Sequence, residues 1–288
     1  MLESRVCVRF YHKIGFVAAL CLMFLAFAPL AEDSCPSMIA DWQGMQDVNV
    51  TAITGKIVFI GQSQTLTVFD WSDLSRPLVQ GSVDFPGVVK GIAVNGQWGF
   101  VAAAEAGLRI LDVSDLTNPE EVGALPVPGS AEGLAISGNF AYVVAGTAGL
   151  RIIDVSNPAL PQDVANVDTP GSALGVSLSG RYAYVADAAS GLRIIDVGDP
   201  AKPLVVGALG TPGFAYGVTV AEVYAYVADR SGLRVVDVRD PDHPQEVGVL
   251  STPSPAYGVT WCNNHVLVSL GYNHVRIISV IDPAHPRE

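Results

Sequence analysis

The chain has 288 residues, of which 50% are hydrophobic and 15% are charged, and its formal net charge is −12 at pH 7. This composition is typical of a folded protein with a large core and excludes a disordered chain. The acidic balance leaves no basic stripe for phosphate groups, so we expect no nucleic-acid partner.

Residues 1–31 have the pattern of a targeting segment. Arg5, Arg9 and Lys13 precede an apolar run from residue 14 to residue 30, as in a secretory signal. The run is also close to the shortest length that spans a membrane. The segment is therefore either a signal peptide or an N-terminal membrane anchor. We expect an exported protein, periplasmic, extracellular or at the cell surface, that meets a membrane only through this segment.

Residues 36–288 are expected to form one domain built from a repeated unit. Its clearest segment is GLRIIDV at residues 149–155, and close copies begin at Gly107, Gly191 and Gly232, with weaker copies at Thr65 and His274. The aspartate of this segment recurs in steps of 42, 42, 42 and 41 residues, at Asp70, Asp112, Asp154, Asp196 and Asp237. Ser279 takes the sixth position. Copies at so regular a period predict a repeat fold.

Each unit reads as four short strands separated by turns. In residues 130–171 we expect strands at 131–137, 140–145, 149–155 and 162–168, with a proline corner after the third. Four antiparallel strands in about 42 residues are the blade of a β-propeller. The sequence therefore predicts an all-β, six-bladed β-propeller. A two-sheet sandwich does not explain equal units at a fixed spacing.

The first strand of five units carries a glycine at one position: Gly91, Gly133, Gly175, Gly217 and Gly258. The innermost strands of a propeller crowd around its axis, and a missing Cβ lets their backbones approach. We therefore interpret this glycine column as structural.

The ring is predicted to be closed by the N-terminal part of the domain. Residues 36–40 (PSMIA) resemble residues 203–207 (PLVVG), which lie at the start of a fourth strand, and the last unit reaches residue 288 where its own fourth strand should begin. We expect residues 37–43 to form the outermost strand of the last blade, which removes a frayed edge. Cys35 and Cys262 then lie at one end of this blade, and whether they are bonded stays open.

The segments GLRIIDVSNPALP and GLRIIDVGDPAKP, each followed by P-G-x-A-x-G, resemble the LVIVP-repeat family. The resemblance covers residues 47–286. It implies a β-propeller of exported, often surface-associated prokaryotic proteins. It implies no particular reaction and brings no catalytic residues to this chain.

Candidate metal ligands are scattered along the sequence. The histidines after the leader lack a metal-binding spacing: His243, His265, His274 and His285. No aspartates form the calcium loop of an EF-hand. Several aspartates in turns and corners are interpreted as Asx caps of backbone N–H groups: Asp187, Asp229, Asp115, Asp199, Asp240 and Asp282. We expect no catalytic residues and no cofactor, and a calcium ion held by several loops stays open.

A binding site is expected at the mouth of the axial channel, where the loops entering the innermost strands converge. The residue before each inner glycine varies while its flanks repeat: Val48 in the first unit, then Lys90, Glu132, Leu174, Tyr216 and Tyr257. Variation on a constant scaffold is typical of a binding site. Lys90, Glu132, Tyr216 and Tyr257 are therefore candidate residues for a small polar ligand or a peptide end. The alternative is that they only plug the mouth.

The arginine and aspartate of the GLRIIDV segment point to opposite faces of their strand. The first unit lacks the arginine and the last lacks the aspartate, which favours pairing of each aspartate with the arginine of the following blade. The sequence predicts five inter-blade ion pairs: Asp70–Arg109, Asp112–Arg151, Asp154–Arg193, Asp196–Arg234 and Asp237–Arg276. The rival interpretation is that each aspartate only caps its own corner.

These patterns predict an exported, non-enzymatic β-propeller, monomeric, that acts as a binding or protein-interaction scaffold. Its partner would be an unidentified protein or a small polar ligand. The alternative is an extracytoplasmic, metal-dependent hydrolase or lyase with its site at the channel mouth, which would need clustered carboxylates and histidines there.

Overall fold

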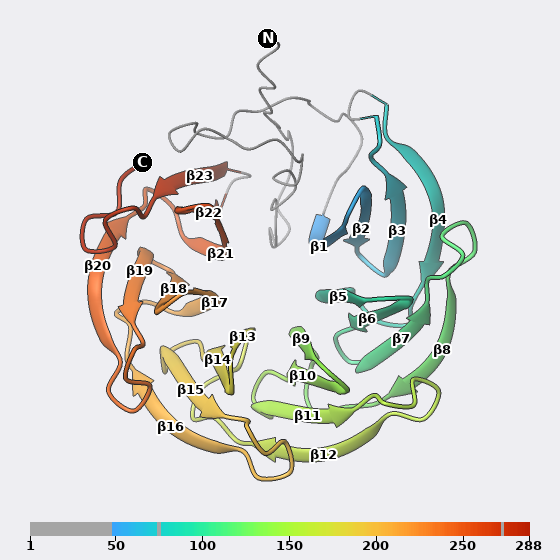
Figure 1. Ribbon diagram of the computed structural model, residues 1–288, viewed down its shortest axis with the longest axis horizontal. Coiled ribbons are helices and arrows are strands. Elements are labelled where there is room, and N and C mark those ends of the chain that lie inside the picture. Colours follow the sequence, from blue (N-terminus) through green and yellow to red (C-terminus); the bar gives the residue numbers. More distant parts are fainter. Residues whose placement is uncertain (1–47, 74–75, 272–273) are drawn as a thin grey trace.

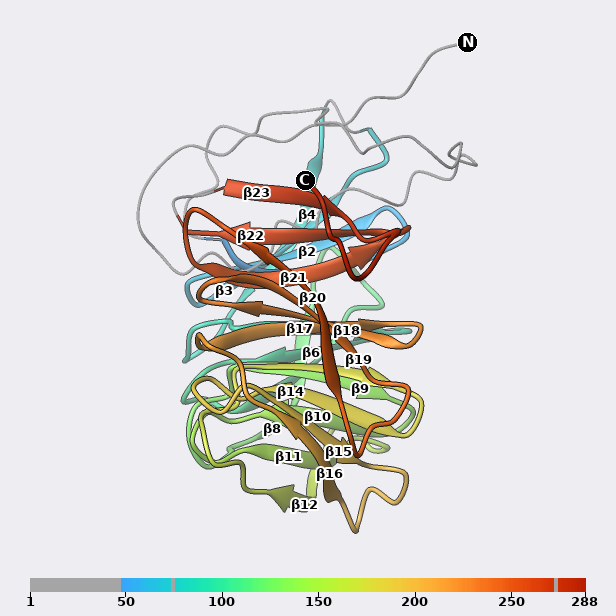
Figure 2. The same cartoon turned by 90° about the vertical axis from the view of Figure 1, so that its left-hand side faces the viewer.

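The chain forms a six-bladed β-propeller in the computed structural model, which describes residues 48–73, 76–271 and 274–288 (Figure 1). The predicted fold class is confirmed. Within each blade the strands follow one another in sequence order and pair antiparallel, from the innermost strand outward. Seen from the side, they run across the thickness of the ring (Figure 2).

The first three blades have four strands each. Blade 1 consists of β1 (Val48–Thr54), β2 (Ile57–Gln62), β3 (Thr65–Asp70) and β4 (Leu78–Asp84). Blade 2 consists of β5 (Gly91–Asn95), β6 (Trp98–Ala102), β7 (Leu108–Asp112) and β8 (Glu120–Leu125). Blade 3 consists of β9 (Gly133–Ser137), β10 (Phe140–Val144), β11 (Leu150–Asp154) and β12 (Gln162–Val167).

Blades 4 and 5 repeat this pattern, and blade 6 has three strands among the described residues. Blade 4 consists of β13 (Gly175–Ser179), β14 (Tyr182–Ala186), β15 (Leu192–Asp196) and β16 (Leu204–Leu209). Blade 5 consists of β17 (Ala215–Ala221), β18 (Tyr224–Asp229), β19 (Gly232–Asp237) and β20 (Gln245–Ser251). Blade 6 consists of β21 (Ala256–Cys262), β22 (His265–Leu270) and β23 (His274–Ser279).

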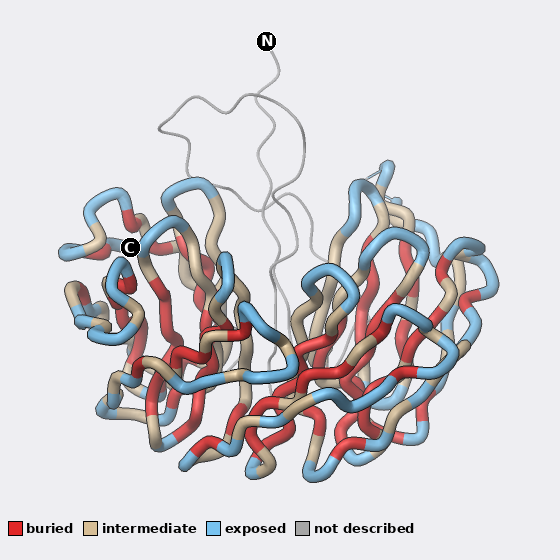
Figure 3. The backbone as a smooth tube through the Cα atoms, turned by 60° about the horizontal axis from the view of Figure 1, so that its bottom comes forward, coloured by how far each residue is buried: buried red, intermediate tan, exposed pale blue. Residues whose placement is uncertain are grey.

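The hydrophobic core lies between the blades rather than inside any one of them. Five clusters of buried side chains each join two neighbouring blades. The cluster between blades 3 and 4, for example, combines Tyr142 and Ile152 with Val185 and Ile195. The buried segments occupy the middle of the strands, and the turns at both ends are exposed (Figure 3). Because a four-stranded blade has two apolar faces, it is stable only with a neighbour on each side.

The inner glycines have the role predicted from the sequence. A Cβ atom at Gly175 would lie 2.9 Å from the carbonyl oxygen of Tyr216 in the next blade, and one at Gly217 would lie 2.9 Å from that of Tyr257. At Gly91 it would lie 2.9 Å from the Cα of Gly133. Contacts this short exclude a side chain, so at these three positions the inner strands approach as closely as they do only because the residue is glycine.

Backbone hydrogen bonds also tie neighbouring blades together at the end where the inner strands begin. The turn after the second strand of one blade forms a β-bridge with the residue that leads into the inner strand of the next. These bridges join Ala104 with Ala131, Gly146 with Ala173, and Ala188 with Ala215. Between blades 1 and 2 the N–H of Val89 donates to the carbonyl oxygen of Ser63 at 2.7 Å.

A third tie lies at the outer rim. The outermost strand carries a β-bulge, and the residue after the bulge faces the proline corner of the next blade. A Cβ atom at Gly123 of β8 would lie 1.9 Å from the carbonyl oxygen of Pro158, and one at Gly207 of β16 would lie 1.9 Å from that of Pro241. At these two junctions the corner of the following blade thus rests directly on the backbone of the blade before it.

The predicted closing strand, residues 37–43, lies outside the described residues, as do Cys35 and the leader at residues 1–31. Arg287 forms a β-bridge with Ser279 of β23. This bridge corresponds to the pairing of Gln162 with Asp154 in blade 3. Cys262 carries a free thiol, and burial raises its pKa. In the described part of the chain, no helix has the length and apolar character needed to cross a membrane.

The inner glycine column yields a stability prediction. Gly175→Ala should lower the free energy of unfolding by about 1–3 kcal/mol, because the new Cβ would meet the backbone of Tyr216, which cannot move without shifting blade 5. Gly133→Ala is the matched control, since its nearest neighbours would be at 3.3 and 3.4 Å. It should cost clearly less in urea unfolding. Equal losses for the two variants would contradict the close-approach explanation.

Candidate binding site at the channel mouth

The six residues that precede or begin the inner strands gather at one end of the axial channel, which we call the mouth. Their backbones are held by the ladder of their own blade: the N–H of Lys90 donates to Ala102 and that of Glu132 donates to Val144, each at 2.8 Å. The variable side chains therefore stand on a rigid ring. The structure brings the four candidate residues together in two separate pairs.

One side of the mouth carries charge. The Lys90 ammonium and the Glu132 carboxylate, from blades 2 and 3, lie 3.4 Å apart, with side chains 32% and 22% exposed. An ion pair of this exposure contributes little to stability. Its two charges compensate each other, which leaves this side polar without a net charge.

The other side of the mouth is aromatic. The rings of Tyr216 and Tyr257, from blades 5 and 6, have centroids 4.9 Å apart and are tilted by 53°. Phe214 stacks on Tyr216 at 6.3 Å and is 43% exposed. We call these three residues the aromatic cluster. Tilted and stacked rings at such distances attract each other beyond their buried area.

Sequence reasoning missed Phe214. In the P-G-x-A-x-G segment the first variable position is Ser130 in blade 3 and Ser172 in blade 4, and phenylalanine replaces serine in blade 5. The same position holds Val88 in blade 2 and Pro255 in blade 6, so the available signal was the one aromatic residue in this column. Arg230 lies next to it, because its backbone N–H donates to the carbonyl oxygen of Phe214 at 3.0 Å. Arg230 is exposed and, within the described ranges, forms no ion pair.

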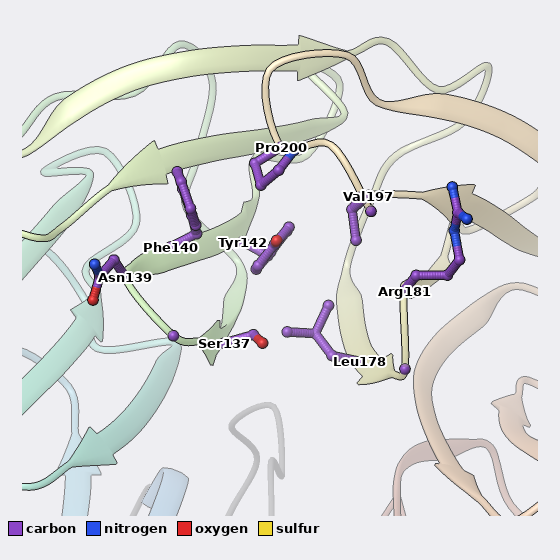
Figure 4. Close-up of a pocket in the computed structure, with 11 residues that line it drawn as sticks. Ser137, Asn139, Phe140, Tyr142, Leu178, Arg181, Val197 and Pro200 are labelled. Atoms are coloured by element: carbon purple, nitrogen blue, oxygen red, sulfur yellow. The ribbon is translucent and has the colours of Figure 1, made fainter.

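A second concave site lies between blades 3 and 4, at the opposite end of the blades (Figure 4). It has a volume of about 480 Å³ and opens beside the turns that join the first and second strands of both blades. We call it the 3/4 groove. Its lining combines apolar side chains with polar ones: Phe140, Tyr142, Leu178, Val197 and Pro200, and Ser137, Asn139 and Arg181.

The repeating unit identifies the family. The LVIVD repeat matches five consecutive segments, residues 46–85, 86–125, 128–169, 170–211 and 212–252. The chain belongs to the LVIVD repeat family. This confirms the resemblance found in the sequence, although the fifth letter of the family's name is the aspartate of the motif rather than proline. The sixth unit lies beyond the matched segments.

Solved structures share the propeller fold at low identity. A functionally unknown protein from Desulfotomaculum acetoxidans DSM 771 has a TM-score of 0.68 and 18% identity, covering 83% of this chain and 84% of that one. The computationally designed Ika8 protein has a TM-score of 0.65 and 11% identity, covering 83% of this chain and 72% of that one. These likenesses concern the fold alone. No curated protein matches the sequence.

The arginine of the LVIVD motif pairs within its own blade, so the five predicted inter-blade ion pairs are wrong. Arg109 lies 3.0 Å from Glu121, and Arg151 and Arg276 bind Asp163 and Glu288 in the same way. Glu121 and Asp163 stand near the start of the outermost strands of the same blades, β8 and β12, and Glu288 follows Arg287, which bridges to β23 of blade 6. An acid near the start of the outer strand is within reach of the arginine. Among the described residues, no ion pair joins a motif arginine to the motif aspartate of the preceding blade.

Blades 4 and 5 pair the motif arginine with an aspartate at the end of the second strand. Arg234 Nε donates to Asp229 at 3.1 Å, and Arg193 Nε lies 3.6 Å from Asp187. Both aspartates are fully buried, and their remaining oxygen positions accept bonds from neighbouring backbone and hydroxyl groups. A buried carboxylate held by several donors and a guanidinium is a structural element, and it anchors the turn at the mouth.

The aspartate of the LVIVD motif caps the corner that follows it. Asp112 accepts a hydrogen bond from the N–H of Ser114 at 2.9 Å, and Asp154 accepts one from Ser156 at 2.8 Å. The corner aspartates, as predicted, form Asx turns: Asp115, Asp199, Asp240 and Asp282. The capping part of the rival interpretation is thus correct, but Asp196 and Asp237 also pair with Arg181 and Arg239. The motif arginines do not simply reach solvent, because they pair within their own blades.

Few groups at the mouth could carry acid–base or metal chemistry. Glu132 is the one acid of the variable ring, and it pairs with Lys90. His243 and His285 lie far along the chain in exposed corners, each beside a corner aspartate, at 3.1 and 2.9 Å. Across the described residues, no three His, Cys, Asp or Glu side chains stand close enough to hold one metal ion.

The caps predict a dependence of stability on pH. Hydrogen bonds from the backbone and the side chain of Ser156 hold the pKa of Asp154 below its usual value. As pH falls through about 4, the unfolded chain therefore takes up a proton at this site before the folded chain does, and stability is lost. Asp154→Asn keeps the acceptor oxygen but does not titrate. Its unfolding free energy should fall less steeply than that of the wild type between pH 5 and pH 3.

Asp154→Ala serves as the comparison, because it removes the cap at every pH and should lower stability already at pH 7. Urea unfolding at a series of pH values measures both effects. Parallel curves for the wild type and Asp154→Asn would show that this carboxylate does not contribute to acid unfolding.

Proposed function

We propose that the protein is a non-enzymatic binding module whose channel mouth holds a segment of another protein. The observation that carries the proposal is the aromatic cluster: Phe214, Tyr216 and Tyr257 form a continuous contact across blades 5 and 6, and Phe214 is 43% exposed. Grouped, exposed aromatic rings on a rigid support are typical of the centres of protein interfaces.

The chemistry beside the cluster favours a protein segment. Arg230, exposed and adjacent to Phe214, adds a cation, and tyrosine and arginine are the residues most enriched at interface hot spots. Tyrosine also offers a large contact area at a small loss of conformational entropy, since it has few rotatable bonds. The Lys90–Glu132 pair on the opposite side would supply a polar rim that hydrogen-bonds the segment without selecting for charge.

We further propose that binding takes place outside the cytoplasm. The support is the basic residues Arg5, Arg9 and Lys13, followed by the apolar run of residues 14–30, which together form the pattern of an export signal. A rigid mouth with variable side chains suits a scaffold that is displayed to other proteins.

Peptide selection tests the proposed site. A phage-displayed library of random 12-residue peptides, selected on the wild type, should yield sequences rich in apolar residues and carboxylates. Tyr216→Ala should weaken the selected peptides about 30-fold in a fluorescence-anisotropy titration, the loss expected at a hot spot. Tyr257→Ala should have a similar effect.

Tyr182→Ala is the control, since Tyr182 lies at the opposite end of blade 4, next to the turn between β13 and β14. It should leave the affinity unchanged. Peptides that bind the wild type, Tyr216→Ala and Tyr257→Ala equally well would refute a site at the mouth.

A further inference from the structure

The junctions between blades follow one rule at the outer rim, with one exception. The residue after the β-bulge is glycine in four blades, and it lies against the corner of the next blade: Gly81, Gly123, Gly207 and Gly248. A Cβ atom at these positions would lie between 1.9 and 2.6 Å from a carbonyl oxygen of that corner. Such an approach is possible for glycine alone.

Blade 3 has Ala165 at this position, opposite Ile152 in the register of β11 and β12. The corner that faces it belongs to blade 4 and contains Pro200. Because alanine has a Cβ, this corner must stand farther from β12 than the other corners stand from their glycines. The 3/4 groove opens at this junction, and Pro200 forms part of its wall.

The groove has the form of a small-molecule site. Its volume of about 480 Å³ falls within the usual range for such sites. Tyr142 from β10, Leu178 from β13 and Val197 from the corner face the same space, with Phe140 and Pro200 at its edge (Figure 4). These aromatic and aliphatic walls suit a flat apolar ring.

One cation stands at the rim. Arg181 donates from Nε to Asp196 at 2.9 Å, and a second nitrogen lies 2.6 Å from the same carboxylate. A guanidinium has five N–H donors, so several remain for a ligand, and the side chain is 61% exposed. Gly198 makes room for it, since a Cβ there would lie 3.0 Å from Arg181 Nε. No acidic residue lines the groove itself.

The neighbouring blade shows the same ion pair without this arrangement. In blade 5 the arginine comes from the corner: Arg239 lies 3.0 Å from Asp237, and its guanidinium covers the ring of Tyr224 at 5.9 Å. Val223 takes the place of Arg181, and the bulge position before this corner is Gly207. Blade 5 therefore provides a matched control for the two residues that distinguish the groove, Arg181 and Ala165.

We propose that the 3/4 groove binds a small aromatic carboxylate. The ring lies between Tyr142, Leu178 and Val197, and the carboxylate accepts hydrogen bonds from the free donors of Arg181. A planar carboxylate can accept hydrogen bonds from the donors that Asp196 leaves free, and its single charge is repelled less by Asp196 than the double charge of a phosphate would be. This site is separate from the protein-binding mouth, and either can fail without the other.

Methyl-labelled NMR of the full-length chain tests the proposal with two probes of equal shape, phenylacetate and phenylacetamide. Phenylacetate should cause saturable shifts of the Leu178 and Val197 methyl signals. Phenylacetamide should bind about tenfold more weakly, because it lacks the charge-assisted hydrogen bonds. The absence of saturable shifts at both residues would overturn the proposal.

Variants separate the two parts of the site. Arg181→Gln should weaken phenylacetate about tenfold and leave phenylacetamide unchanged. Ala165→Gly, which gives blade 3 the residue found in the four other blades, should let the corner close and weaken both probes. Arg239→Gln, which breaks the equivalent ion pair in blade 5, should change neither. Equal binding of the two probes, unaffected by Arg181→Gln, would refute a carboxylate site.

Discussion

Backbone approach between blades is the constraint on which the rest of the propeller depends. At the axis, Gly175 and Gly217 lie so close to the next inner strand that a Cβ atom would stand 2.9 Å from a carbonyl oxygen. At the rim, Gly123 and Gly207 support the corner of the next blade at still shorter distance. The apolar faces of the blades pack in the space between these two radii. Because the distance between neighbouring blades is fixed both at the axis and at the rim, the angle between them is fixed too, and this angle sets the curvature of the ring.

This constraint explains why the fold could be predicted from the sequence and some of its contacts could not. The period of the LVIVD motif, the turn residues and the inner glycines together specify four-stranded blades around an axis. The rim glycines also recur regularly in the sequence, but each one follows a β-bulge. A bulge changes the direction of the side chains after it, so the sequence alone did not indicate that these glycines face the next blade.

The ion pairs show how a correct observation led to a wrong prediction. In most blades the residue 12 positions after the arginine is its acidic partner: Glu121, Asp163, Glu246 and Glu288. The first blade has Thr67 in place of the arginine and Val79 in place of the acid, so no charge is left unpaired there. Where Val205 takes the place of the acid, Arg193 lies beside Asp187 instead. The spacing was available in the sequence. Choosing between two columns of acids required knowing that the arginine lies over the outer strand of its own blade.

The sequence indicated which residues form the variable ring at the mouth. In the structure Lys90 lies beside Glu132, and the ring of Tyr216 contacts that of Tyr257. Phe214 escaped notice because it lies two positions before Tyr216, outside the ring that the pattern defined. The aromatic cluster lies where Phe214 replaces the serine of blades 3 and 4, and the 3/4 groove lies where alanine replaces the rim glycine of blades 1, 2, 4 and 5.

Departures of these two kinds act differently. Phe214 adds a side chain to an exposed edge and leaves the junction between blades 4 and 5 intact. Ala165 changes the junction itself, because its Cβ occupies the space into which a corner would otherwise settle. The first adds binding surface to a closed scaffold, and the second makes a cavity within it. Neighbouring blades of this propeller contact each other at the axis and at the rim, and a groove of this kind forms where a rim contact is lost. The other blades show the same contact intact.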